Sequence, residues 1–193
     1  MKVAFGLRTH SGWAALVALG KSGDELVVVD RSRLELVEEE WAKQPYHAAE
    51  ELEKKEAREV VKRGIAAAKR IARRELRAAV NHERDLGNQV IACSILVGSP
   101  MPDWTVDQIL AVHFRMHQAE GVLFRDVLIE AANECELKVV TLPEKTLLQE
   151  AEKLLRTSTT NLTKTMAVLG KSAGPPWGKD QKDAALAALV GLG

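Results

Sequence analysis

The chain has 193 residues, of which 46% are hydrophobic, and it carries 27 Lys and Arg against 27 Asp and Glu. This length and apolar content suffice for a buried core, so we expect a single domain over residues 1–193. The balanced charge excludes an overall field that would draw the protein to nucleic acid or to a membrane.

The cysteines and the apolar runs indicate the cellular compartment. Cys93 and Cys135 stand apart without C-x-x-C spacing, which favours small reduced thiols over a disulfide or a zinc site. No apolar run is long enough to span a bilayer, and the opening MKVAFGLRTHSGW lacks the pattern of a signal peptide. We therefore expect a soluble, cytoplasmic protein with no membrane partner.

The first 40 residues have the pattern of strands. Turn residues, RTHSG and KSGDE, separate three apolar or alternating runs: KVAFGL, WAALVAL, and LVVVD followed by RLELVEE. Three strands joined by short turns predict an antiparallel meander.

The remaining chain alternates helices with strands. Residues 47–80 contain no proline and predict a long helix, and NQVIACSILV predicts a buried central strand. Residues 105–136 predict a helix in two pieces around Gly121, and LKVVTLP predicts a further strand. A short amphipathic helix, EKTLLQEAEKLL, precedes residues 157–179, which we expect to be a functional or flexible loop, and an Ala-rich helix ends the chain.

This order of elements is the one found in the ribonuclease H-like fold, and three segments resemble its RuvC-type Holliday-junction resolvase branch. FGLRTHSGWAALVAL is similar to the first hairpin of that branch, and HQAEGVLFRDVLIEAANECELKVVTLPEKTL is similar to its helix–strand unit. DQKDAALAAL resembles its D-x-x-D-A-x-A-x-A ending. The resemblance implies an α/β fold in which helices flank a five-stranded mixed sheet with its first three strands antiparallel.

The resemblance also implies a cluster of carboxylates that holds two divalent ions, Mg²⁺ or Mn²⁺, for phosphodiester cleavage. Asp180 and Asp183 match the last two acids and are therefore the expected metal-binding and catalytic residues. The first-strand aspartate falls on Arg8, and the acid after the central strand falls near Gly98. If Arg8 faces the aspartates, an ion pair replaces the metal and the site becomes structural or anion-binding.

The Asp180 and Asp183 pair also has a simpler interpretation, and so does a second group of polar residues. A D-x-x-D pair before an apolar helix is typical of an N-cap and a first-turn acid. His113, His117 and Glu120 lie at i, i+4 and i+7, so they could converge on one metal or phosphate, or form a polar face satisfied by its neighbours.

Basic residues suggest where an anion or nucleic acid would bind. Arg8 and His10 lie just after the first strand, where open α/β sheets commonly contact ligands. The 157–179 segment has no acid and contributes Lys171 and Lys179. The long helix contributes a basic row that could bind phosphates or pair with acids nearby. Its members are Lys62, Lys69, Arg73 and Arg77.

Three functions follow from these observations. The first is a protein associated with DNA or RNA whose metal site is degenerate, so that it is weak or inactive as a nuclease. The second is a non-catalytic interaction protein, a homodimer that packs through the 47–80 helix. The third is a divalent-metal-dependent endonuclease of the resolvase type that uses Asp180, Asp183 and Glu120. The sequence leaves open whether the chain is an enzyme.

Overall fold

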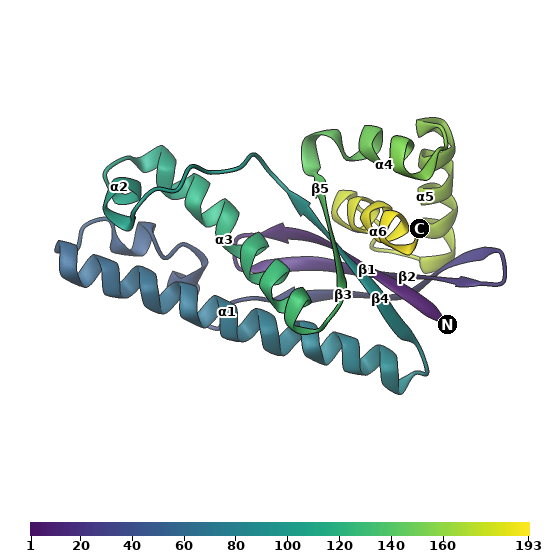
Figure 1. Ribbon diagram of the computed structural model, residues 1–193, viewed down its shortest axis with the longest axis horizontal. Coiled ribbons are helices and arrows are strands. Elements are labelled where there is room, and N and C mark those ends of the chain that lie inside the picture. Colours follow the sequence, from purple (N-terminus) through teal and green to yellow (C-terminus); the bar gives the residue numbers. More distant parts are fainter.

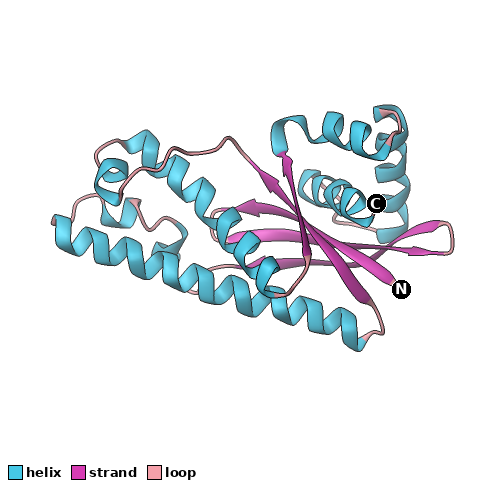
Figure 2. Ribbon diagram, viewed as in Figure 1, coloured by secondary structure: helices cyan, strands magenta, loops and turns pink.

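Five strands form one mixed sheet in the computed structural model, which describes all of residues 1–193 (Figures 1 and 2). The strand order is β3-β2-β1-β4-β5. β1, β2 and β3 are antiparallel, whereas β4 and β5 run parallel to β1. Their bounds are Lys2–His10, Trp13–Ser22, Glu25–Glu35, Gln89–Val97 and Lys138–Pro143.

The N-terminal meander and the mixed sheet confirm the fold class expected from the sequence. Gly12 and Gly23 adopt positive φ angles of 82° and 63° in the two hairpin turns, which suits glycine because it lacks a Cβ. The third run is one continuous strand, because LVVVD and RSRLE both pair with β2.

Helices cover both faces of the sheet (Figure 1). On one face, α1 (Lys54–Asp85) and α3 (His113–Glu134) bury a core with Phe5, Leu7 and Leu16. On the other face lie α4 (Leu147–Leu155), α5 (Thr159–Ala173) and α6 (Lys179–Leu192), which form a second core with Val17 and Leu19. The short α2 (Val106–Leu110) precedes α3. No helix is both long and apolar enough to cross a membrane.

Three of the expected element bounds were wrong. The long helix begins at Lys54 rather than His47, because residues 47–49 form a separate 3-10 turn, η2, and it extends to Asp85. The break in the 105–136 helix falls at Val112, whose backbone is extended (φ −143°, ψ 112°), and α3 continues through Gly121.

The expectation of a loop over residues 157–179 was also wrong, because most of this segment is helix α5. Ser158 caps the helix through its hydroxyl, which accepts a hydrogen bond from the Asn161 N–H at 3.2 Å. Leu162, Met166 and Leu169 recur at helical spacing and are buried against the second core. Packing of this apolar stripe outweighs the weak helix propensity of its threonines and serines.

The two cysteines are free thiols, as expected. Cys93 lies on β4 in the first core, and its complete burial raises the pKa of the thiol to about 12. It is therefore protonated and unreactive at neutral pH.

Helix α6 packs directly on β1 at Gly6. A Cβ placed on Gly6 would lie 1.8 Å from the backbone oxygen of Ala184 and 2.6 Å from the nitrogen of Ala188. Both contacts are to backbone, so no side-chain rotation could relieve them. Gly6 thus allows the start of α6 to lie directly on β1.

We expect Gly6→Ala to destabilise the fold by about 3 kcal/mol or more, at the upper end of the cost of overpacking, because the added methyl meets helix backbone. Urea unfolding followed by circular dichroism measures this cost. The matched control is Gly178→Ala, where a Cβ would meet only the flexible Gln181 side chain at 3.3 Å. The control should cost less than about 1 kcal/mol. Equal costs for the two variants would contradict the close contact.

Candidate functional site: an arginine among three carboxylates

Arg8 lies near the end of β1 and is surrounded by three carboxylates. Its Nη1 donates a hydrogen bond to Asp183 Oδ2 at 2.9 Å and lies 3.1 Å from Asp180 Oδ1. Its Nη2 donates to Glu144 Oε1 at 2.8 Å. The Arg8 side chain is only 12% exposed, whereas the carboxylates are 21–35% exposed. The ion pair that the sequence raised as an alternative to a metal is therefore present.

The sheet topology brings these groups together. β1, β4 and β5 are parallel neighbours, so their carboxyl ends meet at one edge of the sheet. Arg8 projects near the end of β1, and Glu144 follows directly after β5. Asp180 and Asp183 lie in the first turns of α6 and share one face of it, because they are three residues apart.

The start of α6 is held by the preceding loop. Arg31 of β3 donates from Nη1 to the backbone oxygens of Gly174 and Pro176, each at 2.6 Å. The indole of Trp177 donates to the Met166 oxygen of α5 at 2.9 Å. The N-cap of α6 is Gly178, whose N–H donates to the Gln181 side chain at 3.0 Å. Neither aspartate is therefore the N-cap, and both side chains are directed to Arg8 instead.

Two further basic residues lie beside the aspartates. His10 stacks on Trp13, with 4.2 Å between ring centroids, and its Nε2 lies 3.2 Å from Asp180 Oδ1. Lys179 forms an ion pair with Asp183, one helical turn away. Asp180 and Asp183 thus each contact a second basic side chain in addition to Arg8.

The end of β4 also presents a cation rather than an acid. A Cβ on Gly98 would lie 2.5 Å from Nη1 of Arg125, so the guanidinium of this α3 residue packs against the Gly98 backbone. Burial lowers the pKa of Arg125, and the negative charge of Glu144 acts in the opposite direction. Arg125 therefore places a second guanidinium in the field of Glu144.

This donor set does not fit the two divalent ions that the resemblance implies. Carboxylates are suitable ligands for such ions. The Arg8 guanidinium, however, occupies the position between them and already balances part of their negative charge. At the end of β4, the backbone of Gly98 offers no carboxylate. The arrangement instead suits a permanent ion-pair cluster, because arginine does not lose its proton in proteins.

A cavity of about 610 Å³ opens beside the cluster between α4, α5 and α6. Glu144 and Asp183 line it together with apolar side chains such as Leu147, Met166 and Trp177. Four lysines also line it, and two of them were expected from the sequence. They are Lys145, Lys171, Lys179 and Lys182.

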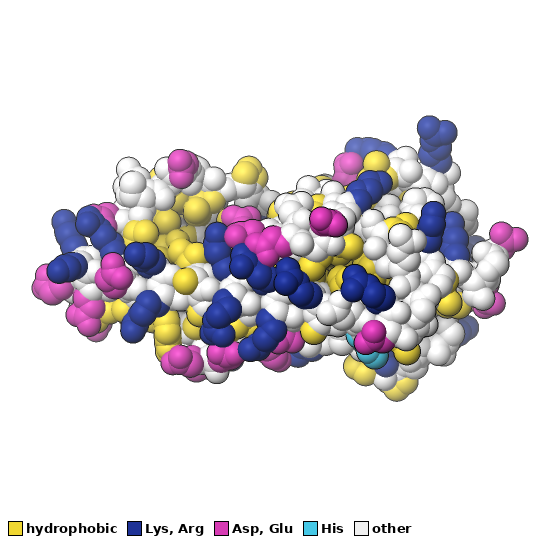
Figure 3. All heavy atoms as spheres, turned by 60° about the horizontal axis from the view of Figure 1, so that its bottom comes forward, with side chains coloured by type: hydrophobic (Ala, Val, Ile, Leu, Met, Phe, Trp, Pro, Cys, Tyr) yellow, Lys and Arg dark blue, Asp and Glu magenta, His cyan; other side chains and the backbone are white.

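Two of the four residues in the basic row of α1 are paired with acids. Lys69 lies 2.7 Å from Glu130, and Arg73 forms an ion pair with Glu134. Lys62 and Arg77 form no ion pair within the chain. Figure 3 shows acidic side chains interspersed among the Lys and Arg residues on the face that α1 presents. This surface therefore combines paired and unpaired basic residues, and only Lys62 and Arg77 match the open phosphate-binding alternative.

Glu120 does not join Asp180 and Asp183. It is buried (2% exposed), and its Oε1 accepts hydrogen bonds from the N–H groups of Tyr46 and His47, both at 3.1 Å. Its Oε2 lies 2.8 Å from His47 Nδ1. The other two members of the expected polar cluster, His113 and His117, are exposed and lie with their Nε2 atoms 3.2 Å apart.

Sequence reasoning missed Glu144, Arg125 and His47. Glu144 had a signal, since it follows the strand LKVVTLP and parallel strands end at a common edge. The position of Arg125 is set by the packing of α3 over Gly98, and that of His47 by the path of the chain before α1. No local sequence pattern indicated either position.

Comparison with known proteins supports the fold assignment. No protein-family model and no curated protein sequence matches the chain. The solved structures that it resembles include Thermus thermophilus RuvC, at 10% identity and a TM-score of 0.51, over 97% of this chain and 91% of that one. The T. thermophilus RuvC complex with a Holliday junction substrate matches over the same shares, at 10% identity and a TM-score of 0.53.

These similarities show the fold of the chain. The chain has a ribonuclease H-like fold. Within that class its structural neighbours are RuvC Holliday-junction resolvases, which agrees with the resemblance noted in the sequence.

We expect Arg8→Met to destabilise the protein by about 1–3 kcal/mol, because it leaves three partly buried carboxylates without their shared cation. Chemical denaturation of a double-mutant cycle measures this effect. Asp180→Asn alone should destabilise, but in the Arg8→Met background it should restore stability by removing repulsion.

The control is Arg58→Met, which removes an exposed ion pair with Asp107 and should cost less than about 1 kcal/mol. If Arg8→Met costs no more than this control and shows no coupling to Asp180, the cluster does not contribute to stability.

Proposed function

We propose that the protein binds nucleic acid through a ribonuclease H-like fold whose carboxylate site is closed by an arginine, and that it is weak or inactive as a nuclease. The observation that carries the proposal is the Arg8 guanidinium bound among Asp180, Asp183 and Glu144. Two metal ions would have to displace a cation that already contacts every carboxylate of the cluster.

The association with nucleic acid rests on two observations. The fold is similar to that of a RuvC solved with a Holliday junction substrate. The lysine-lined cavity opens next to the Arg8 cluster, at the edge where parallel strands end. Of these lysines only Lys179 forms an ion pair, whereas two of the four residues in the basic row of α1 do, so we expect phosphates to contact the cavity lysines rather than α1.

Neither alternative function gains support of this kind. A nuclease that uses Glu120 as its third acid would need that carboxylate beside Asp180 and Asp183, but its two oxygens bind Tyr46 and His47. A homodimer through α1 would bury the ion pairs that Lys69, Arg73 and Arg74 form with acids of the same chain. The tests below distinguish all three functions.

We expect the protein to bind DNA four-way junctions and duplexes with an affinity that falls steeply with salt. Replacing Lys145, Lys171, Lys179 and Lys182 by glutamine should reduce the slope of log K against log salt by about 0.9 for each lost phosphate contact. Fluorescence anisotropy over a range of salt concentrations measures the slope for each DNA.

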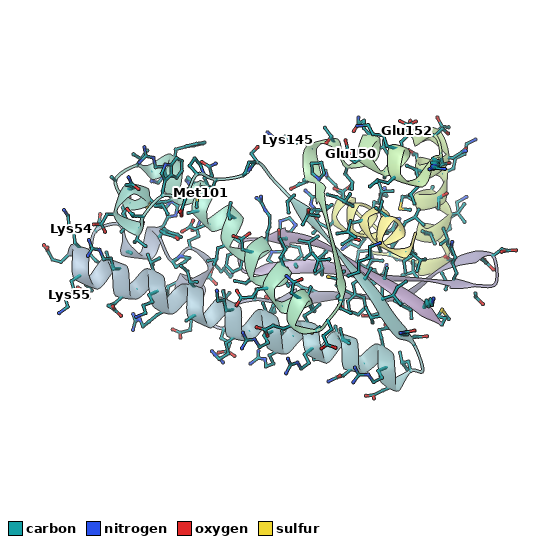
Figure 4. All side chains as sticks on the ribbon, viewed as in Figure 1. Lys54, Lys55, Met101, Lys145, Glu150 and Glu152 are labelled. Carbon is teal, nitrogen blue, oxygen red and sulfur yellow. The ribbon has the colours of Figure 1, made fainter.

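The matched control replaces Lys54 and Lys55, which lie where α1 begins, far along the molecule from Lys145 (Figure 4). This variant should bind DNA as the wild type does. Absence of DNA binding by the wild type, together with a dimer in sedimentation, would favour the interaction protein. Equal loss in both variants would argue against the cavity as the binding surface.

We expect Arg8→Asp to create a site for Mn²⁺, because it replaces the central cation by a fourth carboxylate. Calorimetry should detect binding in this variant but not with Arg8 present, and Mn²⁺ should raise its melting temperature. Adding Asp183→Asn should abolish the gain. His113→Asn and His117→Asn are introduced into every protein compared, so that imidazoles bind no metal.

Two results would contradict the proposal. If the protein with Arg8 intact binds Mn²⁺ through Asp183 and cleaves branched DNA, the arginine does not close the site. If Arg8→Asp folds yet binds no Mn²⁺, the carboxylates are not placed where metal ligands would have to lie.

A further inference from the structure

A cluster of three histidines lies outside the Arg8 site. His47 belongs to the η2 turn before α1, and His113 and His117 occupy the first two turns of α3. One ring nitrogen of each lies within 4.8 Å of the other two. In Figure 1 this end of α3 lies on the opposite side of the molecule from α6. The two sites share no residue.

Carboxylates hold two of the three rings by their Nδ1 atoms. Glu120 Oε2 lies 2.8 Å from His47 Nδ1, and Glu120 itself is fixed by two backbone N–H groups. Glu50 Oε1 lies 3.4 Å from His113 Nδ1. A carboxylate that accepts the Nδ1 proton fixes the tautomer and leaves the lone pair on Nε2, as metal-binding histidines require.

The Nε2 atoms form no hydrogen bond outside this cluster. His47 Nε2 is buried and has no hydrogen-bond partner, which is costly for a polar atom in a folded chain. His113 Nε2 and His117 Nε2 face one another at 3.2 Å. With a proton on one of them, the two nitrogens form a hydrogen bond, and a cation bound to both would take the place of that proton.

The spacing of His113 and His117 is that of two ligands to one zinc ion, and the nitrogen of His47 lies within 4.8 Å of both. With zinc–nitrogen bonds of about 2.0–2.1 Å, tetrahedral geometry places two ligand nitrogens about 3.3 Å apart. The His113–His117 pair already has this separation. Histidines four residues apart on one helix are a known arrangement for zinc, and the third ligand comes from a different segment.

We propose that His47, His113 and His117 bind one Zn²⁺ ion through their Nε2 atoms. The fourth position faces solvent, because His113 and His117 are exposed, and it accepts water or a ligand from outside the chain. Imidazole nitrogens select zinc over magnesium, which prefers oxygen. Glu120 is a positioning residue here. It orients His47 and binds no metal itself.

The test uses the untagged full-length protein after removal of metal by chelation. Calorimetry with ZnCl₂, in competition with a chelator of known affinity, should give one ion per chain. His113→Asn/His117→Asn should lose binding by at least 100-fold, and since both side chains are exposed this variant should fold. Glu120→Gln should weaken binding about 10–100-fold, the usual effect of losing an outer-shell partner.

Two control variants test whether Zn²⁺ binds at this cluster and not elsewhere on the protein. His82→Asn removes an exposed histidine of α1 outside the cluster and should leave the affinity for Zn²⁺ unchanged. Asp180→Asn/Asp183→Asn should also leave it unchanged. Co²⁺ in place of Zn²⁺ should give the visible absorption of a tetrahedral site, and the double histidine variant should lose it.

Absence of stoichiometric binding by the wild type would overturn the proposal. Binding that survives the double histidine substitution, or that disappears with Asp180 and Asp183, would also overturn it. These results are independent of whether the protein binds DNA.

Discussion

The position of the candidate site depends on the direct contact of α6 with β1 at Gly6. Because a strand alternates its faces, Gly6 and Arg8 lie on the same face of the sheet, the one that α6 covers. Ala184, whose backbone touches Gly6, follows Asp183 directly and lies one turn after Asp180. Once the helix packs on the strand, both carboxylates therefore lie over Arg8. A larger residue at position 6 would lift the helix and separate the ion pairs.

The charge at this edge of the sheet follows from its burial. Three carboxylates that are only 21–35% exposed repel each other unless cations accompany them. In a metal-dependent nuclease the ions supply that charge, whereas here Arg8 contacts all three and Lys179 contacts one. Arg125 adds its charge from the end of β4. Since a guanidinium neither dissociates nor deprotonates, the neutralisation is permanent rather than dependent on metal concentration.

The sequence predicted those features of the fold and the site that leave a local pattern of residues, and it missed those that depend on contacts between distant segments. The resemblance placed Arg8 opposite Asp180 and Asp183, and those contacts are present. The sequence did not predict helix α5, because its threonines have a weak helix propensity. The apolar stripe of Leu162, Met166 and Leu169 stabilises the helix only when it packs against α4 and α6. Glu120 had helical spacing with His113 and His117, but its direct partner, His47, is 73 residues away in sequence, a separation that no periodic pattern encodes.

The two clusters use carboxylates in opposite ways. At the sheet edge, carboxylates surround a fixed cation, and their lone pairs are taken up by its N–H groups. At the start of α3, carboxylates contact His47 and His113 at Nδ1, the Nε2 atoms of His113 and His117 face one another, and Nε2 of His47 is buried without a partner. A divalent ion would compete with an arginine in the first cluster but only with a proton in the second. The donors suited to a metal therefore lie outside the site where the fold's resemblance to resolvases would lead one to look.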